Sequence, residues 1–334
     1  MGALAIGPAL CTCFRSVCFF AKKFAFAHFA SFEHSCANRH CCNCFRAGVS
    51  RAGKWGISGR ASSDRNWRCN NRGLSMKSNW PTFDVLKQKS RNSKYLVVIP
   101  VINEGSRLHK LLERMKTLGV GRDYDILIAD GGSNDGSIDL VKFEELQVRH
   151  ILVKQGPGKL GAQLQGAYKF ALDLGYEGVI TLDGNDKDRP EAIPLIASKL
   201  DAGIDFVQGS RFVKGGHQSR TPLFRLVAIR LIHAPLLSIS SGFHWTDTTQ
   251  GFRGYSRKLL TCPKLDLFRP ILDDYKLLFY ISHRAPRIGL KAIEVPTTRV
   301  YPSNVAVPTK IKGLTANLEV LKSLVKVAFG VYDQ

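Results

Sequence analysis

Short apolar runs and stretches of helical periodicity alternate along the chain from Tyr95 onward. The run Tyr95–Ile99 is β-branched and apolar and ends at Pro100, and Arg107–Leu118 then repeats apolar residues at helical spacing. The same pair recurs as a strand at Tyr124–Ala129 and a helix at Ser137–Leu146. Because strands alternate with helices, the pattern predicts an α/β fold. We expect a mostly parallel central sheet of right-handed, Rossmann-like βαβ units with helices on both faces.

The pattern continues toward the end of the chain, where two stretches allow two interpretations each. The apolar segment Leu223–Ile239 carries Arg225 and Arg230, and it suits either a helix in a membrane interface or a core helix with snorkelling arginines. The basic amphipathic segment Ile311–Phe329 suits either an anionic membrane surface or packing on the domain. No run of ~18 apolar residues is free of charge, so no membrane-spanning helix is predicted. The other expected elements are Val148–Val153, Ala162–Leu174, Val179–Leu182, Ile193–Leu200, Asp205–Gln208 and Ile293–Pro296.

An acidic residue directly follows the predicted strand Val179–Leu182. In open α/β sheets ligands bind outside the carboxyl ends of the strands, and Asp183 lies at such an end, followed by flexible Gly184 and by Asn185. Oxygen ligands at this place suit Mg²⁺ or Mn²⁺ carrying the phosphates of a substrate. The pattern therefore marks Asp183 and Asn185 as a candidate metal–diphosphate site. The alternative interpretation is a simple Asp-Gly-Asn turn.

Two glycine-rich loops add further candidates. Asp130 also ends a strand and is followed by Gly131 and Gly132, so it suits either a hydrogen bond to a base or ribose or an Asx-type turn with a helix cap. Residues 155–161 form a glycine-rich turn before a helix, where Lys159 suits either a diphosphate or plain solvation. The turn matches neither a P-loop nor a dinucleotide-binding fingerprint.

Charge and cysteine are unevenly distributed. Residues 1–75 hold eleven Lys and Arg against two acidic residues, which is +9 of the total +21, and eight of the nine Cys. Three interpretations of residues 1–75 are open. They could be an organelle transit peptide, they could hold zinc at a weakly matched site around Cys36–Cys44, or they could be untranslated because synthesis starts at Met76. We favour the last interpretation because everything domain-like begins after Met76. We expect a leader at 1–75 that is disordered or absent from the mature protein, a folded domain at 76–302, and an amphipathic helical tail at 303–334.

The remaining composition bears on compartment and partners. Only Cys262 follows Met76, which suits a reducing compartment. The net positive charge favours anionic partners, namely phosphorylated substrates, a membrane surface or nucleic acid. We expect a cytoplasmic protein attached peripherally to the cytoplasmic face of a membrane.

Five motifs occur in order along the folded domain: Val97–Glu104, Asp125–Ser137, Thr181–Glu191, Gly209–Arg211 and Thr246–Tyr255. Together they resemble glycosyltransferase family 2, and within it the polyprenyl-phosphate sugar transferases similar to dolichol-phosphate mannose synthase. The resemblance covers roughly residues 94–302. It implies the GT-A fold, a nucleotide-diphosphate-sugar donor, and transfer with inversion to a polyprenyl phosphate. A sugar hydroxyl is the alternative acceptor.

The resemblance also implies roles for single residues, and it has two departures. Asn185 stands where the family has a second Asp, so Asp186 or Asp188 is an alternative second metal ligand. The closing Arg…Gly-Ser-Lys motif is blurred after Arg299 and leaves Lys310 as a distant candidate. The implied donor-binding residues are Pro100, Asn103, Glu104, Asp130, Gly132, Lys159, Asp183 and Gly184, and the implied residues near the acceptor are Arg211, Arg225, Asp247 and Arg253.

The acceptor decides which chemistry is needed. A phosphate acceptor is already anionic and needs no general base, whereas a hydroxyl must lose its proton to a carboxylate, for which Asp247, Asp273 and Asp274 are candidates. Two other functions compete with this interpretation. A nucleotidyltransferase would carry a glycine- and lysine-rich loop where this chain has Val101–Glu104, and a nucleic-acid-binding protein would depend on the basic leader. We expect no nucleic acid as a partner.

Overall fold

The computed structural model of the chain describes residues 66–67, 81–302 and 313–333. These residues belong to one compact unit, Ser62–Gln334. The expected leader lies outside them except for Asn66–Trp67, which form the short strand β1. The candidate zinc residues Cys36–Cys44 and the distant candidate Lys310 also lie outside the described residues. The division into leader, domain and tail stays a prediction.

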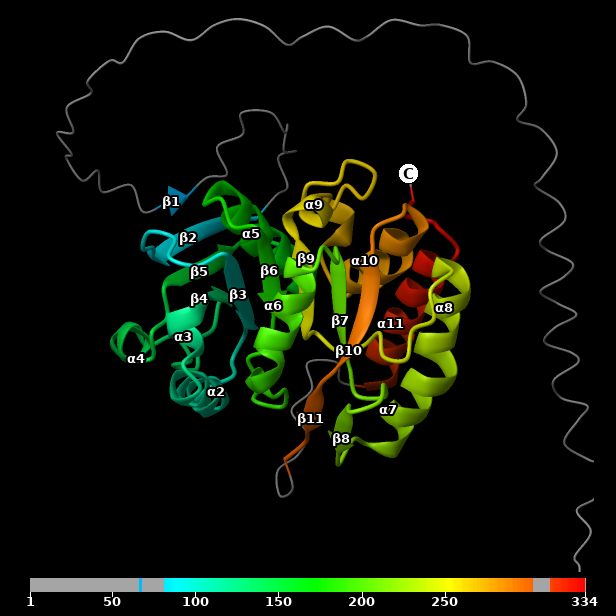
Figure 1. Cartoon of the computed structure of the whole chain (residues 1–334), viewed down its shortest axis with the longest axis horizontal. Coiled ribbons are helices and arrows are strands. Elements are labelled where there is room, and N and C mark those ends of the chain that lie inside the picture. The colour runs from blue at the N-terminus through cyan, green and yellow to red at the C-terminus, as the bar shows by residue number, and fades with distance from the viewer. Residues whose placement is uncertain (1–65, 68–80, 303–312, 334) are drawn as a thin grey trace, which may run out of the picture. The chain divides into compact units, whose positions relative to one another are not determined.

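A nine-stranded sheet forms the centre of this unit (Figure 1). The strands lie side by side in the order β1-β2-β5-β4-β3-β6-β9-β7-β10. A second, two-stranded sheet pairs β8 (His217–Ser219) with β11 (Thr298–Val300) in parallel. The other strands of the large sheet are β2 Thr82–Lys87, β3 Tyr95–Val101, β4 Asp125–Asp130, β5 His150–Gln155, β6 Gly178–Thr181, β7 Phe206–Ser210, β9 Arg253–Ser256 and β10 Ala292–Pro296.

The strands expected from the apolar runs form the parallel part of the sheet. β3 pairs in parallel with β4 and β6, β4 with β5, and β7 with β10. The predicted α/β fold with a mostly parallel sheet is therefore confirmed. β2 lies antiparallel beside β5, and β9 lies antiparallel between β6 and β7. The strand β9 was not among the expected elements, because Arg253–Ser256 pairs with strands on both sides without an apolar run to reveal it.

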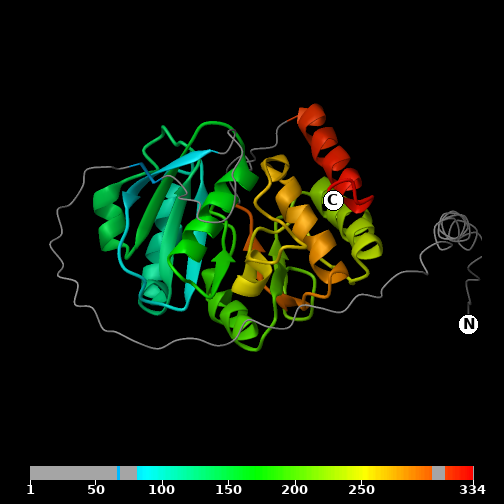
Figure 2. The same cartoon turned by 90° about the horizontal axis from the view of Figure 1, so that it is seen from above.

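Each face of the sheet buries its own core. Along β3, Leu96 and Val98 belong to one core and Val97 and Ile99 to the other, because side chains alternate along a strand. Helices cover both faces, as the two views show (Figures 1 and 2). On one face lie α2 Ser106–Thr117, α3 Val120–Asp123, α4 Leu140–Glu145 and α6 Ile193–Asp201, and on the other lie α5 Leu160–Asp173, α8 Ala234–Ser241, α9 Arg257–Leu260, α10 Lys276–Arg287 and α11 Gly313–Ala328.

The two segments with open interpretations are both helical and differ in burial. α11 packs with α8 and α10 and buries Leu324 and Val327, so the expected packing on the domain is confirmed for that helix. The segment Leu223–Ser241 is one continuous helical stretch of 19 residues, and 17% of its apolar part is buried. By length and composition alone it could cross a membrane. The interpretation as a core helix is therefore wrong for most of it. This stretch consists of α7 Leu223–Ala228, the π-helical turn η2 Ile229–His233 and α8. Short 3₁₀ turns occur elsewhere, at η1 Pro190–Ala192 and η3 Pro270–Leu272.

A buried histidine beside the central strands is held in its neutral form. Nε2 of His150 on β5 lies 2.9 Å from the Tyr176 hydroxyl, which donates to Asp125 Oδ2 at 2.6 Å. Since the tyrosine proton is directed to Asp125, Nε2 carries the ring proton, and Nδ1 has no hydrogen-bond partner within the described part of the chain. Burial lowers the pKa of His150 to about 4, although Asp125 opposes that shift.

Stability should fall as the pH drops below the ordinary pKa of histidine toward about 4. In that range the unfolded chain takes up a proton at His150 and the folded chain does not, so protonation favours unfolding. Between pH ~7.5 and pH ~5 we expect His150→Gln to lose about 2 kcal/mol less of its free energy of unfolding than the wild type. Urea unfolding at both pH values measures this. The exposed His217→Gln is the matched control, and an unchanged pH dependence in His150→Gln would contradict the neutral, buried assignment.

Candidate active site

A cleft of about 750 Å³ opens at the carboxyl ends of the central strands. Its walls come from the ends of β3 and β6, the loop before α5, the start of α10, and α11. The lysines Lys154 and Lys276 and the carboxylate Asp274 also line it and were not assigned to the donor site from the sequence. The structure brings together six of the predicted donor and metal residues on this cleft: Pro100, Glu104, Lys159, Asp183, Gly184 and Asn185.

Asp183 lies at the floor of the cleft, two residues after the end of β6, and against Gly251. A Cβ atom at Gly251 would lie 2.3 Å from Asp183 Oδ1, and a Cβ atom at Gly184 would lie 3.1 Å from a methyl carbon of Val101. A side chain at position 251 would therefore push the carboxylate out of its place. Gly251 belongs to the motif Thr246–Tyr255, and only the structure shows that it makes room for Asp183.

Arg299 binds the carboxylate of Asp183. Its Nη2 donates to Asp183 Oδ2 at 3.1 Å, and its Nη1 donates to Asp188. Asp188 is fully buried, and its Oδ1 accepts from Gln250 Nε2 at 2.7 Å. Burial raises the pKa of Asp188, and Arg299 opposes that shift. Asp183 is thus already paired with a cation of the protein.

The other candidate metal ligands do not complete a site around Asp183. Asn185 directs Nδ2 toward Asp183 Oδ2 at 3.4 Å, and its Oδ1 accepts from the Lys187 backbone N–H at 3.3 Å. Asp186 pairs with Arg114 at 2.8 Å instead. No group of three His, Cys, Asp or Glu suited to a metal occurs among residues 66–67, 81–302 and 313–333. As it stands, the pair offers Mg²⁺ or Mn²⁺ one carboxylate that is already bound to a guanidinium and one amide that directs its nitrogen to that carboxylate.

Asp130 turns back onto its own loop. Its Oδ2 accepts from the backbone N–H groups of Gly132 and Ser133, each at 2.8 Å, and Gly132 has φ +93°, which favours glycine. Asn103 Oδ1 accepts from the Asn134 N–H at 2.9 Å and fixes the neighbouring loop. The Asx-turn interpretation therefore describes Asp130 as it stands. The base-binding role of Asp130, Asn103 and Gly132 stays a prediction.

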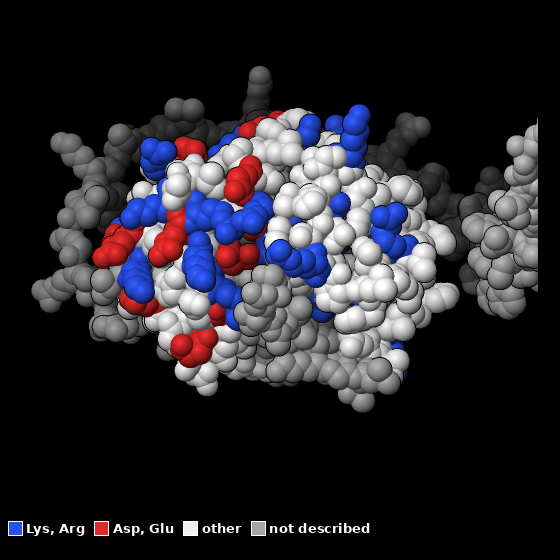
Figure 3. All heavy atoms as spheres, turned by 90° about the horizontal axis from the view of Figure 1, so that it is seen from below, with Lys and Arg blue, Asp and Glu red and all other residues white. Residues whose placement is uncertain are grey.

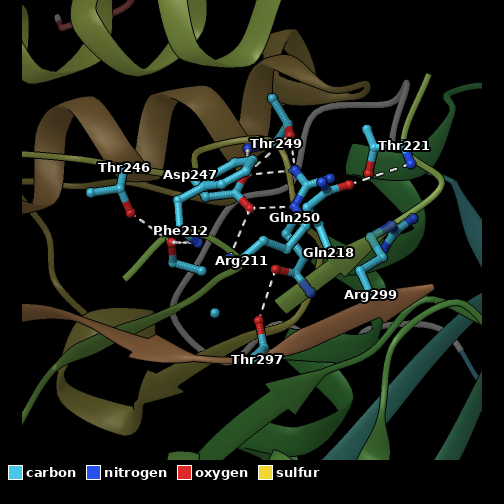
Figure 4. Close-up of polar contacts among 12 residues, drawn as sticks. Arg211, Phe212, Gln218, Thr221, Thr246, Asp247, Thr249, Gln250, Thr297 and Arg299 are labelled. Carbon is cyan, nitrogen blue, oxygen red and sulfur yellow. Dashed lines mark hydrogen bonds and ion pairs between the residues drawn. The ribbon is translucent and has the colours of Figure 1, made fainter. Parts of the chain in front are cut away.

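Arg211 and Asp247 form a buried ion pair (Figure 4). Arg211 Nε donates to Asp247 Oδ2 at 2.6 Å and Nη2 donates to Oδ1 at 2.9 Å, while Nη2 also reaches the Thr249 hydroxyl at 3.0 Å. The side chains of Arg211 and Asp247 are 2% and 0% exposed. Arg211 binds both oxygens of this enclosed carboxylate, so the expectation that Asp247 serves as a general base does not fit this geometry.

Arg253 does not face the cleft either. It is fully buried, and it donates to the backbone carbonyls of Thr248, Gln250 and Leu278 at 2.8, 2.9 and 2.8 Å. Its guanidinium fastens the loop before β9 to α10. The expectation that Arg253 lies near an acceptor is therefore replaced by a positioning role.

Glu294 completes this arrangement and was not singled out from the sequence. It lies on β10 and accepts from the backbone N–H groups of Thr246 and Asp247, each within 3.0 Å, and from the Thr246 hydroxyl at 2.8 Å. Burial raises the pKa of Glu294, while these hydrogen bonds oppose the shift. The only sequence signal for Glu294 was one acidic residue within a predicted strand.

Three cations gather around the ring of Tyr301. Lys187 Nζ lies 5.0 Å from the ring centre, and the guanidinium carbons of Arg225 and Arg299 lie 5.9 and 5.8 Å from it. Arg225 also donates to the Tyr301 hydroxyl at 3.1 Å. Although burial raises the pKa of Tyr301, Arg299 and Arg225 bring it below its usual value. Arg225 was expected near an acceptor, whereas Lys187 and Tyr301 were not identified from the sequence. We call these four residues the Tyr301 cluster.

Comparison with known proteins identifies the class. The model of the family described as "Glycosyl transferase family 2" matches residues 96–262, which is half of the chain. The chain belongs to glycosyltransferase family 2 and is a glycosyltransferase. Transfer in this family inverts the anomeric centre. Family membership together with the observed α/β sheet confirms the expected GT-A fold class.

Two curated relatives are similar over most of their own length. Polyprenol monophosphomannose synthase from Mycolicibacterium smegmatis is 29% identical over 207 residues, which cover 61% of this chain and 76% of that protein. Undecaprenyl-phosphate mannosyltransferase from Micrococcus luteus is 29% identical over 212 residues, which cover 62% and 84%. A crystal structure of glucosyl-3-phosphoglycerate synthase from Mycobacterium tuberculosis with Mn²⁺, UDP and glucosyl-3-phosphoglycerate is 16% identical, covers 71% of this chain and 79% of that chain, and has a TM-score of 0.49.

Removing one partner of the Arg211–Asp247 pair should destabilise the protein more than removing both. Asp247→Asn leaves a buried guanidinium without its counter-charge, which costs about 3–5 kcal/mol of the free energy of unfolding. The double variant Arg211→Met, Asp247→Leu should lose less, because no charge stays unpaired. Urea unfolding of Arg211→Met, of Asp247→Leu and of the double variant measures the coupling between the two residues, and Asp247→Asn is unfolded in the same way. A loss below about 1 kcal/mol in Asp247→Asn would show that the pair is not needed to hold this loop.

Proposed function

We propose that this glycosyltransferase moves a sugar from a nucleotide-diphosphate-sugar donor to a polyprenyl phosphate of the dolichyl or undecaprenyl class. The supporting observation is that all three carboxylates considered as general bases are bound to cations. Asp247 is bound by Arg211, and Lys276 Nζ lies 3.2 Å from Asp273 and 2.8 Å from Asp274. A hydroxyl acceptor needs a free base and a phosphate acceptor does not, so this arrangement favours the phosphate.

The donor fits the cleft at the strand ends. Lys154 and Lys159 line it near Asp183, so a diphosphate there would meet positive charge, whereas the charge of Lys276 is shared with Asp273 and Asp274. Lys154 Nζ donates to the Gly156 carbonyl at 2.7 Å, and burial lowers the pKa of this lysine. In the transfer, an acceptor phosphate oxygen attacks the anomeric carbon from the side opposite the diphosphate. The bond to the diphosphate breaks with its electron pair on the leaving group, and the configuration inverts.

We place the acceptor at the Tyr301 cluster, which Arg299 joins to Asp183 at the cleft floor. The Tyr301 cluster concentrates Lys187, Arg225 and Arg299 around one ring, which favours an anionic group such as a phosphate monoester. The printed names of both curated relatives refer to mannose transfer involving polyprenol or undecaprenyl phosphate. A lipid phosphate acceptor would also explain why the protein exposes an apolar helix.

We further propose that this helix lies in the interface of a membrane, on its cytoplasmic side. Leu223, Phe224, Leu231 and Ile239 of the stretch Leu223–Ser241 are 74, 67, 71 and 83% exposed. Figure 3 shows that charged side chains crowd one half of the face drawn, whereas the half beneath α7 and α8 is mostly uncharged with isolated Lys and Arg. A large exposed apolar surface edged by basic residues suits anionic lipid better than water.

A transfer assay with nucleotide-sugars and a short polyprenyl phosphate tests the proposed function. We expect formation of a chloroform-extractable sugar, reduced about 100-fold or more in Asp183→Ala, because Arg299 then loses a partner and the loop that forms the cleft floor loses its anchor. Asp173→Asn, which changes a carboxylate at the far end of α5, is the control and should match the wild type. Donor turnover without a lipid product would instead support a sugar-hydroxyl acceptor, and absence of turnover with every donor would contradict both.

Sedimentation with phosphatidylcholine vesicles that contain phosphatidylglycerol tests the membrane proposal. Each apolar side chain withdrawn from water contributes on the order of 1 kcal/mol or more, so Leu223→Gln, Leu231→Gln and Ile239→Gln together should weaken binding at least about tenfold. Leu118→Gln and Leu140→Gln remove exposed leucines, 43 and 48% exposed, near the helices of the opposite face and should leave binding unchanged. Equal binding of both variants would exclude the stretch Leu223–Ser241 as the membrane contact.

A further inference from the structure

One guanidinium serves two carboxylates at the floor of the cleft. Arg299 donates through Nη2 to Asp183 at 3.1 Å and through Nη1 to Asp188, and its own side chain is 9% exposed. Asp188 has a further donor in Gln250. Asp183 is therefore largely neutralised by the protein before any ligand binds.

Lys187 brings a second positive charge to the same place. It is 3% exposed, and it lies in the loop that follows Asp183. Its Nζ lies 5.0 Å from the centre of the Tyr301 ring, and the guanidinium carbon of Arg299 lies 5.8 Å from the same centre, so the two cations are neighbours.

The backbone fixes both cations. The Val300 N–H donates to the Lys187 carbonyl at 2.8 Å, and Asp188 and Arg299 form an isolated β-bridge. The loop after Asp183 is therefore attached to β11 on both sides of Asp188. The backbone of Lys187 and Arg299 is therefore held beside the loop that carries Asp183.

A divalent ion at Asp183 would have to displace these interactions. Arg299 would have to release the carboxylate, and Asn185 would have to turn its amide oxygen away from the Lys187 N–H. The ion would then carry two positive charges into a region that already contains two buried cations, which costs Coulomb energy.

We propose that Lys187 and Arg299 replace the divalent ion in this protein, so that the donor diphosphate binds and the sugar is transferred without Mg²⁺ or Mn²⁺. This inference rests on the proposed function, because it concerns the charge that develops on the leaving diphosphate. When the sugar–diphosphate bond breaks, one negative charge goes to the diphosphate, the acceptor oxygen forms the new bond to the sugar, and no proton moves. Lys187 and Arg299 keep Asp183 from repelling that charge, and the lysines that line the cleft contact it.

Binding of Mn²⁺ tests the inference without relying on turnover. The full chain is titrated with Mn²⁺, alone and with UDP or GDP, and free Mn²⁺ is followed by electron paramagnetic resonance. We expect the wild type to leave the signal as it is in a protein-free sample. The variant Asn185→Asp, Lys187→Met gains a carboxylate and loses a cation, so it should bind Mn²⁺ at least about tenfold more tightly. Tight binding of one Mn²⁺ by the wild type, lost in Asp183→Ala, would overturn the inference.

The affinity for nucleoside diphosphates separates the two proposals. Calorimetry with UDP, GDP, ADP, CDP and dTDP is run in EDTA and in excess Mg²⁺, and we expect the Kd of the preferred diphosphate to agree within about threefold between the two conditions. A Kd that is about 100-fold weaker in EDTA would overturn the inference and leave the proposed function standing. Absence of binding to all five in both conditions would contradict both.

Charge variants at Lys187 test the role of the lysine itself. We expect Lys187→Met to weaken diphosphate binding in EDTA about tenfold and Lys187→Arg to restore most of it, because the latter keeps the charge. The exposed Lys264→Met is the matched control and should match the wild type. Equal binding by folded Lys187→Met would contradict the role of the lysine. If Lys187→Met does not fold, the Mn²⁺ titration and the comparison in EDTA on the wild type still decide the question.

Discussion

The guanidinium of Arg299 joins parts of the chain that are far apart in the sequence. From β11 it reaches Asp183 and Asp188, which stand at the beginning and the end of the loop after β6. Gln250, just before β9, donates to Asp188 and accepts from the Thr297 hydroxyl at 3.0 Å. These polar groups are almost all buried, so the loss of any one partner would leave another unsatisfied in a medium of low dielectric constant. The shape of the cleft floor therefore depends on one connected network.

The same principle governs the loop before β9. Asp247 binds Arg211, Glu294 accepts from the backbone of Thr246 and Asp247, and Arg253 donates to three carbonyls. Several acidic and basic residues in the family motifs thus serve to fix loops and do not face the cleft. A motif identifies a residue by its type and spacing, but it does not distinguish a side chain that contacts ligand from one that holds a turn. Lys159 and Asp183 line the cleft, whereas Asp247 and Arg253 do not.

The elements that could be predicted from the sequence are those whose burial leaves an apolar pattern. β3 and its parallel neighbours are such elements, and Asp183 followed from the rule that ligands bind at strand ends. β9 left no such signal, because its place is fixed by backbone hydrogen bonds on both edges. The helix expected from Ser137 begins only at Leu140, because the Ser137 hydroxyl accepts from the backbone of Glu104 and its neighbour. The partner of Asp183 could not be found by spacing, since Arg299 lies 116 residues away.

The acceptor side of the proposed reaction and the apolar surface meet in one short helix. α7 exposes Leu223 and Phe224. The next residue, Arg225, donates to the Tyr301 hydroxyl. A lipid phosphate held in a membrane interface would have its chain beside the first two side chains and its charged group within reach of the third. Because such an acceptor arrives already ionised, the site needs positive charge more than it needs a base. Arg225 supplies that charge next to Lys187 and Arg299 at the Tyr301 ring, and Arg299 already neutralises Asp183 beside it.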